Sequence, residues 1–272
     1  MNNYNSTIQK VLTAIESDME YIKIEDLISV SGYSYYHFHR IFKAYTGETL
    51  NKYIKRLQLE SALHQMQIDK ENITKIAMKS GYNTPSSFNK AFKEMFSINP
   101  SEYKKSLEPK RKLYVDIEPV RVENIDPIDV YTIRHVGDYT VLDRVWDILM
   151  RFASKNYFFC DDFYAYAIAY DNPDVSDSQK LRYDACISKI KEVKFPQNSQ
   201  IQTKCLSGGK YAIFLHRGDH TNLINTYNSI FGNWLYKSDI ELRDVPVLQK
   251  FLNNKKEVTT KELLTEVYVP IV

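Results

Sequence analysis

A tripeptide that occurs twice constrains the first part of this chain. The segment "SGYSYYHFHRIFKAYTG" begins at Ser31, and "SGYNTPSSFNKAFKEMF" begins at Ser80. When the two segments are aligned with one inserted residue, Phe38 falls on Phe88 and Phe42 on Phe92. A unit of about 50 residues is therefore repeated, and we expect the same local fold to form twice.

Each copy has the pattern of two helices separated by a glycine turn. Apolar periodicity stops at Gly32 in the first copy and at Gly81 in the second, and glycine accepts the left-handed backbone of a tight helix end. Ser34 then stands as the N-cap of the next helix, and Thr84 with Pro85 does so in the second copy. This layout predicts two helix-turn-helix units, at about residues 24–47 and 73–97.

The residues between the two units predict one uninterrupted helix. Residues 49–67 contain no glycine or proline and keep apolar side chains at helical spacing. At 1.5 Å per residue this helix is about 27 Å long, which suits two recognition helices in successive major grooves about 34 Å apart. Lys52, Lys55 and Arg56 are candidate phosphate contacts on it, and an ordinary solvated face is the alternative.

The second helix of each unit has an apolar side and a polar side. At 100° per residue, Phe38, Ile41, Phe42 and Tyr45 share one side of the first, and Phe88, Ala91, Phe92 and Met95 share that side of the second. The opposite sides carry hydrogen-bonding and cationic side chains, which read base edges and hold phosphates in the major groove. The alternative is that these polar sides are simply solvated. The same kind of polar side occurs in both units, which argues against this alternative. The candidate DNA contacts are Tyr36, His39, Arg40, Lys43, Ser86, Asn89, Lys90 and Lys93.

Charge and composition are consistent with this interpretation. Residues 1–112 carry 17 Lys and Arg against 12 Asp and Glu, whereas the remaining residues carry 19 against 22. A basic first part favours a polyanionic partner. No apolar run approaches the roughly 18 residues of a membrane span, and residues 1–10 lack a signal-peptide core, so we expect a soluble cytoplasmic protein.

No metal site or cofactor is expected. The three cysteines are too scattered for a zinc site or a disulfide framework. His37 and His39 point about 200° apart on a helix, so they cannot share an ion.

The rest of the chain contains a second repeat. A shift of 81 residues places His135 on His216 and Trp146 on Tyr227, and each copy has the pattern of a strand, a glycine turn and an amphipathic helix. Residues 119–272 therefore predict an α+β domain with a cleft where the two halves meet. The charged stretch with prolines at 108–118 predicts a linker, which leaves residues 1–107 as the helical domain.

Residues 8–105 resemble the DNA-binding domain of the AraC/XylS family. The matching positions are Gly32 and Tyr33, Phe42 and Lys43, Thr46 and Gly47, Gly81 and Tyr82, Phe92 and Lys93, and Pro100 to Tyr103. The resemblance implies an all-α domain that binds adjacent major-groove segments of double-stranded DNA, usually in a transcription activator, with RNA polymerase as a partner. By position, the family's base-reading residues fall on Tyr36, His39, Arg40, Ser86, Asn89 and Lys90.

The second half resembles the GyrI-like ligand-binding domain of Rob-type regulators, a tandem of two strand-helix-strand-strand repeats. The matching stretches include "HVGDYTVLDRVWDILMRF" and "GGKYAIFLHRGDHTNLINTYNSIFGNWL". The resemblance implies a small amphipathic, often cationic, molecule bound between aromatic rings, whose faces attract positive charge. Ordinary core packing is the alternative for each ring. The candidate ligand residues are Tyr139, Trp146, Phe214, Trp234, Gln249, Phe251 and Tyr268.

One departure from the GyrI-like pattern concerns charge. The family usually has a glutamate where this chain has Gln249, and Glu266 is a candidate replacement for the lost charge. We hypothesise a ligand that is less cationic than usual, or a constitutive activator whose second domain only contacts other proteins. A hydrolase domain fused to a DNA-binding domain is the third alternative. The missing glutamate and Phe251 argue against acid-base chemistry, so we expect no enzyme activity.

Overall fold

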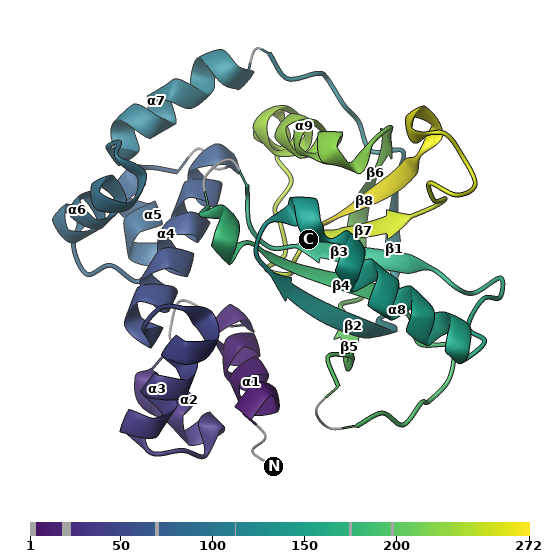
Figure 1. Cartoon of the computed structure of the whole chain (residues 1–272). Coiled ribbons are helices and arrows are strands. Elements are labelled where there is room, and N and C mark those ends of the chain that lie inside the picture. Colours follow the sequence, from purple (N-terminus) through teal and green to yellow (C-terminus); the bar gives the residue numbers. More distant parts are fainter. Residues whose placement is uncertain (1–3, 18–22, 69–70, 112, 174–175, 197–198) are drawn as a thin grey trace. The chain divides into compact units, whose positions relative to one another are not determined.

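The computed structural model describes residues 4–17, 23–68, 71–111, 113–173, 176–196 and 199–272. The chain divides into two compact units, Met1–Lys110 and Arg111–Val272 (Figure 1).

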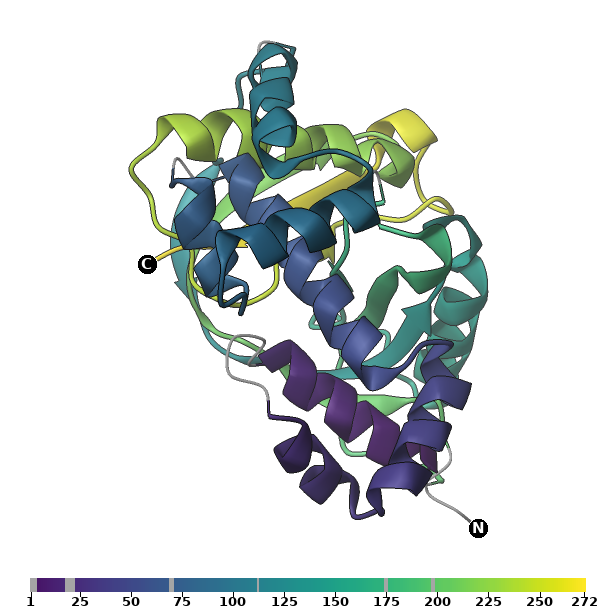
Figure 2. The same cartoon turned by 90° about the vertical axis from the view of Figure 1, so that its left-hand side faces the viewer.

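The first unit is built from helices, and it contains the predicted tandem of helix-turn-helix motifs. One motif is α2 (Ile24–Ser31) with α3 (Tyr35–Thr46), and the other is α5 (Ile73–Lys79) with α6 (Pro85–Phe96). The long helix α4 (Leu50–Ile68) runs between the two motifs, and α7 (Pro100–Arg111) follows the second (Figures 1 and 2). The recognition helices α3 and α6 are therefore held by one rigid connecting helix.

Helix α1 (Tyr4–Ser17) is an element that the sequence analysis did not place. Its apolar side chains are buried in the same core as Phe38 and Phe42 of α3. The signal was present in the sequence, because Ile8, Val11, Leu12 and Ile15 follow the i, i+3, i+4, i+7 spacing of a helix.

Tyr45 departs from the predicted apolar stripe. It is 42% exposed at the edge of α3, and its hydroxyl accepts a hydrogen bond from Nε2 of Gln9 at 2.8 Å. The expectation that Tyr45 is buried was therefore wrong. Its polar hydroxyl is satisfied at the surface by α1, which the sequence analysis had not considered.

The turns between the helices follow the prediction, but one cap does not. Gly32 and Gly81 have φ angles of 67° and 76°, which lie in the left-handed region that side chains disfavour. The Thr84 hydroxyl accepts a hydrogen bond from the backbone N–H of Ser87 at 3.2 Å. Ser34 stands at the corresponding N-cap, yet its side chain makes no capping hydrogen bond.

The second unit is a single eight-stranded antiparallel sheet with helices packed on it. The strands lie in the order β1-β6-β8-β7-β3-β4-β2-β5. Their bounds are Arg121–Ile125 for β1, Ile128–Val136 for β2, Ala165–Ala169 for β3, Arg182–Ser188 for β4, Gln202–Leu206 for β5, Gly209–Arg217 for β6, Leu248–Phe251 for β7 and Leu264–Pro270 for β8. The helices are α8 (Asp143–Lys155) and α9 (Leu223–Ser229), and α9 continues through the π-helical turn η4 (Ile230–Trp234) into α10 (Leu235–Lys237).

The predicted duplication is confirmed by this topology. One repeat is β2-α8-β3-β4 and the other is β6-α9-β7-β8, and the two repeats join where β3 pairs with β7. His135 and His216 make the same contact, since Nε2 of each lies 3.1 Å from a backbone carbonyl, that of Asp138 or of Asp219. Both histidines fix equivalent turns, which explains why they are paired in the sequence.

The predicted linker starts later than expected. Helix α7 continues to Arg111, inside the stretch 108–118 that the sequence assigned to the linker. The segment from Leu113 to Pro119 has no regular secondary structure and leads into β1.

Candidate DNA-binding surface and ligand cleft

The polar sides of α3 and α6 are open to solvent. Tyr36 is 82% exposed, and Arg40 and Lys43 are exposed beside it. On α6 the exposed residues are Ser86, Asn89, Lys90 and Lys93. Within the described residues, no acidic side chain is paired with Arg40, Lys43, Lys90 or Lys93, so these four cations keep their full charge for a polyanion.

His39 is less accessible than the rest of this surface. Its ring lies 4.3 Å from the ring of Tyr35, and its Nε2 atom is covered without a hydrogen-bond partner among the described residues. His37 instead meets the ring of Tyr33 edge-on at 5.1 Å. The two imidazoles contact different tyrosines, as their spacing on a helix requires. No cluster of three or more His, Cys, Asp or Glu suited to a metal occurs in the described part of the chain.

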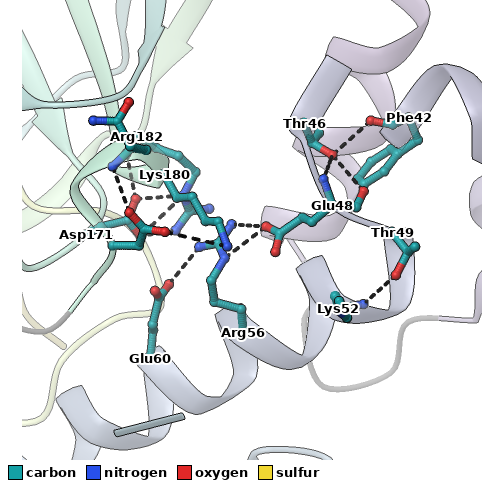
Figure 3. Close-up of polar contacts among 12 residues, drawn as sticks. Phe42, Thr46, Glu48, Thr49, Lys52, Arg56, Glu60, Asp171, Lys180 and Arg182 are labelled. Carbon is teal, nitrogen blue, oxygen red and sulfur yellow. Dashed lines mark hydrogen bonds and ion pairs between the residues drawn. The ribbon is translucent and has the colours of Figure 1, made fainter. Parts of the chain in front are cut away.

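Arg56 does not belong to the phosphate-binding surface, contrary to the sequence-based suggestion. Its Nη2 atom lies 2.7 Å from Oε1 of Glu48, and its Nη1 atom lies 3.1 Å from Oε2 of Glu60 (Figure 3). Arg56 is only 7% exposed, so its charge is neutralised within the helical unit. Glu60, four residues after Arg56, was the available signal for this pairing. Lys52 and Lys55 remain exposed on α4.

In the second unit, α8 and α9 approach the same face of the sheet around a cluster of aromatic rings. Trp146 of α8 meets Phe251 of β7 edge-on at 5.5 Å between ring centroids, and it lies 6.5 Å from Tyr183 of β4. Tyr139 lies 5.7 Å from Tyr183, and His220 lies 4.9 Å from Phe251. The structure therefore brings together Tyr139, Trp146 and Phe251, three of the predicted ligand residues.

Gln249 lies beside this ring cluster in an uncharged environment. It is 4% exposed, and its Nε2 donates a hydrogen bond to the hydroxyl of Tyr227 on α9 at 3.0 Å. Burial raises the pKa of Tyr227 to about 12, so the phenol is neutral at pH 7. Burial, and then the charge of Lys255, lower the pKa of His220, which favours its neutral form. This face thus offers rings and neutral hydrogen-bonding groups.

Phe214 and Trp234 are placed differently from the other predicted ligand residues. Their rings meet edge-on at 4.8 Å, and both side chains are buried between β6 and η4. In this conformation they form core rather than an open wall.

Tyr268 and Glu266 lie on the opposite face of the sheet. Gln249 pairs with Val267, and side chains alternate along a strand, so the neighbours of Val267 point away from Gln249. Tyr268 therefore cannot line a common pocket with the ring cluster, which corrects the sequence-based grouping.

Glu266 cannot replace the carboxylate missing at position 249. Its two oxygens accept hydrogen bonds from Arg121, with Nη2 at 3.0 Å from Oε2. Burial opposes ionisation of Glu266, but Arg121 and Tyr268 outweigh it and lower the pKa of the carboxyl. The charge of Glu266 is therefore balanced by Arg121, and Glu266 lies on the opposite face of the sheet from a ligand beside Gln249.

An open depression of about 550 Å³ occurs elsewhere, on the Tyr268 side of the sheet. It is lined by residues 125–129, Asp162, Tyr164, Tyr166 and residues 188–190. None of the seven predicted ligand residues lines it. The depression is open and lies on the other face of the sheet from the ring cluster, so we do not assign the effector to it.

Three residues in and around the ring cluster were not predicted from the sequence, namely Tyr183, His220 and Tyr227. The repeat supplied a signal for one of them, because the shift of 81 residues aligns Tyr227 with Trp146. Tyr183 of β4 reaches the cluster through Trp146, and His220 in the turn after β6 reaches it through Phe251, so only the tertiary structure brings these two residues there.

Comparison with known proteins supports the assignment of both domains. Residues 118–272 match the family described as GyrI-like small molecule binding domain, and residues 27–106 match a helix-turn-helix domain family. The Transposon Tn10 TetD protein of Escherichia coli is 32% identical over 104 residues, which cover 38% of this chain and 75% of that protein. The HTH-type transcriptional activator AarP of Providencia stuartii is 31% identical over 103 residues, which cover 38% of this chain and 76% of that protein.

Among solved structures, the EcmrR–DNA complex in EcmrR-RPo is similar over 92% of this chain and 85% of that chain, with 15% identity and a TM-score of 0.48. Tandem helix-turn-helix motifs followed by a duplicated α+β domain define a class of two-domain transcription regulators. This chain belongs to the AraC/XylS family and carries a C-terminal GyrI-like small-molecule-binding domain of the Rob type. In the described residues, no helix is long and apolar enough to cross a membrane.

Proposed function

We propose that this protein is a sequence-specific transcription activator that places α3 and α6 in successive major grooves of double-stranded DNA. Tyr36, His39 and Arg40 would read bases from α3, and Ser86, Asn89 and Lys90 would read bases from α6. Lys43 and Lys93 would hold the flanking phosphates. RNA polymerase is the expected protein partner of such an activator.

The observation that carries this proposal is the same exposed cationic stripe on two equivalent helices. Arg40 and Lys43 on α3 correspond in the repeat to Lys90 and Lys93 on α6, and all four are exposed. Exposed cations in this arrangement neutralise phosphates and release counterions, which supplies most of the affinity for DNA. An arginine can also bind O6 and N7 of a guanine together, which supplies specificity.

We further propose that a small amphipathic molecule binds at the ring cluster between α8 and α9. The supporting observation is that Tyr139, Trp146 and Phe251 converge there beside neutral hydrogen-bonding groups of Gln249 and Tyr227. Gln249 offers a neutral amide, so a cation beside it would lose hydration and gain ring contacts without a matching charge at position 249. The expected ligand is therefore largely apolar and carries little or no positive charge.

Selection of duplexes from a random pool by the full chain tests the DNA-binding proposal. With the selected duplex, we expect Arg40→Ala to weaken binding by about 1–3 kcal/mol and to relax the preference at one base position. Fluorescence anisotropy gives the affinity, and a second selection gives the preference.

Arg144→Ala is the matched control, because Arg144 is an exposed arginine on α8 in the other unit. If Arg40→Ala and Arg144→Ala bind the selected duplex equally well, the assignment of Arg40 to base reading is wrong. A wild-type chain that enriches no sequence would contradict the proposed function as a whole.

A further inference from the structure

The segment that leads from the helical unit into β1 is seated on the helix that follows β6. The ring of Tyr114 lies against Gly232 in η4. A methyl carbon on Gly232 would lie 2.6 Å from Cδ2 of Tyr114 and closer still to Cε2, distances that real contacts do not reach. Since Gly232 is buried, the ring occupies the space that any other side chain at this position would fill.

Polar contacts hold the next residues of the same segment. Nδ2 of Asn233 donates hydrogen bonds to Oδ1 of Asp116 at 2.7 Å and to the backbone carbonyl of Val115 at 3.3 Å. Nζ of Lys237 lies 2.7 Å from the same Asp116 oxygen. We call these contacts of Tyr114, Val115 and Asp116 with Gly232, Asn233 and Lys237 the linker seat.

The other repeat has a related ring contact, because the shift of 81 residues aligns Tyr114 with Phe195, and the ring of Phe195 lies 6.2 Å from that of Phe152 on α8. What differs is the helix that receives the segment. The shift of 81 residues aligns Gly232 with Arg151, which is exposed on the regular helix α8. Glycine is a poor helix former, and π-helical turns are rare and often mark functional positions. The second repeat therefore carries two local departures, a glycine and a π-helical turn, at the point that receives the linker.

The same turn also reaches the ring cluster where the ligand is proposed to bind. Trp234, next to Asn233, meets Phe214 edge-on, and Phe231, next to Gly232, stacks on Tyr227 at 6.1 Å. Tyr227 in turn accepts the hydrogen bond from Gln249. Gly232 and Asn233 of this turn thus touch the linker, and Phe231 and Trp234 on either side of them touch the surroundings of the ring cluster.

We propose that the linker seat couples ligand binding at the ring cluster to DNA binding by the helical unit. This inference rests on the proposed function. A ligand that displaces Tyr227, on which Phe231 stacks, shifts η4, and a shifted η4 no longer offers the space at Gly232 or the amide of Asn233. The linker is then released, and the freedom of the DNA-binding unit changes. Because coupling is reciprocal, DNA binding changes the affinity of the ring cluster for its ligand by the same factor, and we expect it to change η4 through the same contacts.

The first test measures hydrogen exchange in the full-length protein with and without the selected duplex. In the wild type we expect the duplex to change exchange in residues 226–237 as well as in the recognition helices. In Tyr114→Ala we expect faster exchange in residues 113–118 and no response of residues 226–237 to the duplex. Val115→Ala is the control, because the Val115 side chain is 73% exposed and only its backbone takes part in the linker seat.

The second test compares affinities for the same duplex. We expect Tyr114→Ala and Asp116→Asn to shift the dissociation constant by about fivefold or more, the lower end of usual allosteric coupling, while Val115→Ala stays within twofold. A weaker complex means that the seated linker favours the DNA-bound state, and a tighter complex means that it opposes it.

A third variant separates local misfolding from loss of coupling. Gly232→Ala places a methyl group in the space of the Tyr114 ring, so alone it should speed exchange in residues 113–118 and 226–237. In the double variant Gly232→Ala and Tyr114→Ala the clash is removed. Residues 226–237 should then regain slow exchange while the linker stays free.

The proposal is overturned if Tyr114→Ala frees the linker and leaves the dissociation constant within twofold of the wild type. It is also overturned if residues 226–237 of the wild type do not respond to the duplex. A failure of the proposed function gives a different result, because the wild type itself would then show no sequence preference.

Discussion

Replacing Gln249 by glutamate places a carboxyl group in the uncharged environment between β7 and α9. The side chain at this position is 4% exposed, and its neighbour is the Tyr227 hydroxyl at 3.0 Å. Glu266 and its partner Arg121 lie on the other face of the sheet, and the residues paired with position 249 on the neighbouring strands are Ala167 and Val267, which carry no charge. We expect Gln249→Glu to destabilise the second unit in a pH-dependent way.

The size of this destabilisation follows from the burial of the side chain at position 249. Full burial raises a glutamate pKa by about 3 units or more from its ordinary value of about 4.3. With a folded-state pKa near 7.3, ionisation-linked destabilisation is about 1 kcal/mol at pH 5 and about 4 kcal/mol at pH 8. The Tyr227 hydroxyl can donate to the carboxylate and recovers about 1 kcal/mol. The net loss of stability between pH 5 and pH 8 is therefore about 2 kcal/mol.

The sign of the pH dependence of stability follows from the raised pKa of the new carboxyl group. The folded protein holds the proton to higher pH than the unfolded chain does, so stability relative to the wild type falls as the pH rises. Urea unfolding at a series of pH values measures this difference. Gln249→Met is the control, since it has similar size and no charge and should show a pH-independent change. If Gln249→Glu and Gln249→Met have parallel pH profiles, position 249 is open to water and its assignment to a buried, uncharged environment is wrong.

Two further predictions concern stability. Thr84→Ala should lower the free energy of unfolding in urea by about 1 kcal/mol, because it removes a capping hydrogen bond. Ser34→Ala should lower it by only about a few tenths of a kcal/mol, since the Ser34 side chain makes no capping hydrogen bond. Equal losses would refute this reasoning. Burial alone would raise the pKa of Asp184, but Arg134 and then Lys204 outweigh it and hold that pKa at about 2. This depressed pKa stabilises the fold above pH 4 by about 2 kcal/mol, and the stabilisation is lost as the pH falls from about 4 to about 2. Asp184→Asn should lack that acid-dependent loss, and an unchanged acid profile would contradict the assignment.

Much of the helical unit could be read from the sequence because its signals are local. The glycine turns, the capping Thr84 and the stripes of α3 and α6 depend on residues no more than one or two helical turns apart. Such patterns survive without knowledge of the tertiary structure. The same holds for the duplication of the second unit, in which each repeat carries its own strand, turn and helix.

The grouping of residues into sites was predicted less well. Tyr268 has the residue type of a ligand wall, but the register of β7 against β8 puts it on the other face from Gln249. Arg56 has the residue type of a phosphate contact, but the turn before α4 brings Glu48 onto it. In both cases the residue type was suitable and the neighbours decided its role.

The sequence by itself therefore determined the two repeats, the helix-turn-helix units and the exposed stripes that face DNA in the proposed function. Only the tertiary structure decided which charges cancel and which segments touch. Glu266 meets Arg121 across 145 positions of the chain, and Asn233 meets Asp116 across 117. The physical reason is that helical and strand periodicity repeat within a few residues, whereas pairing between distant segments depends on strand register and packing, which no local pattern contains.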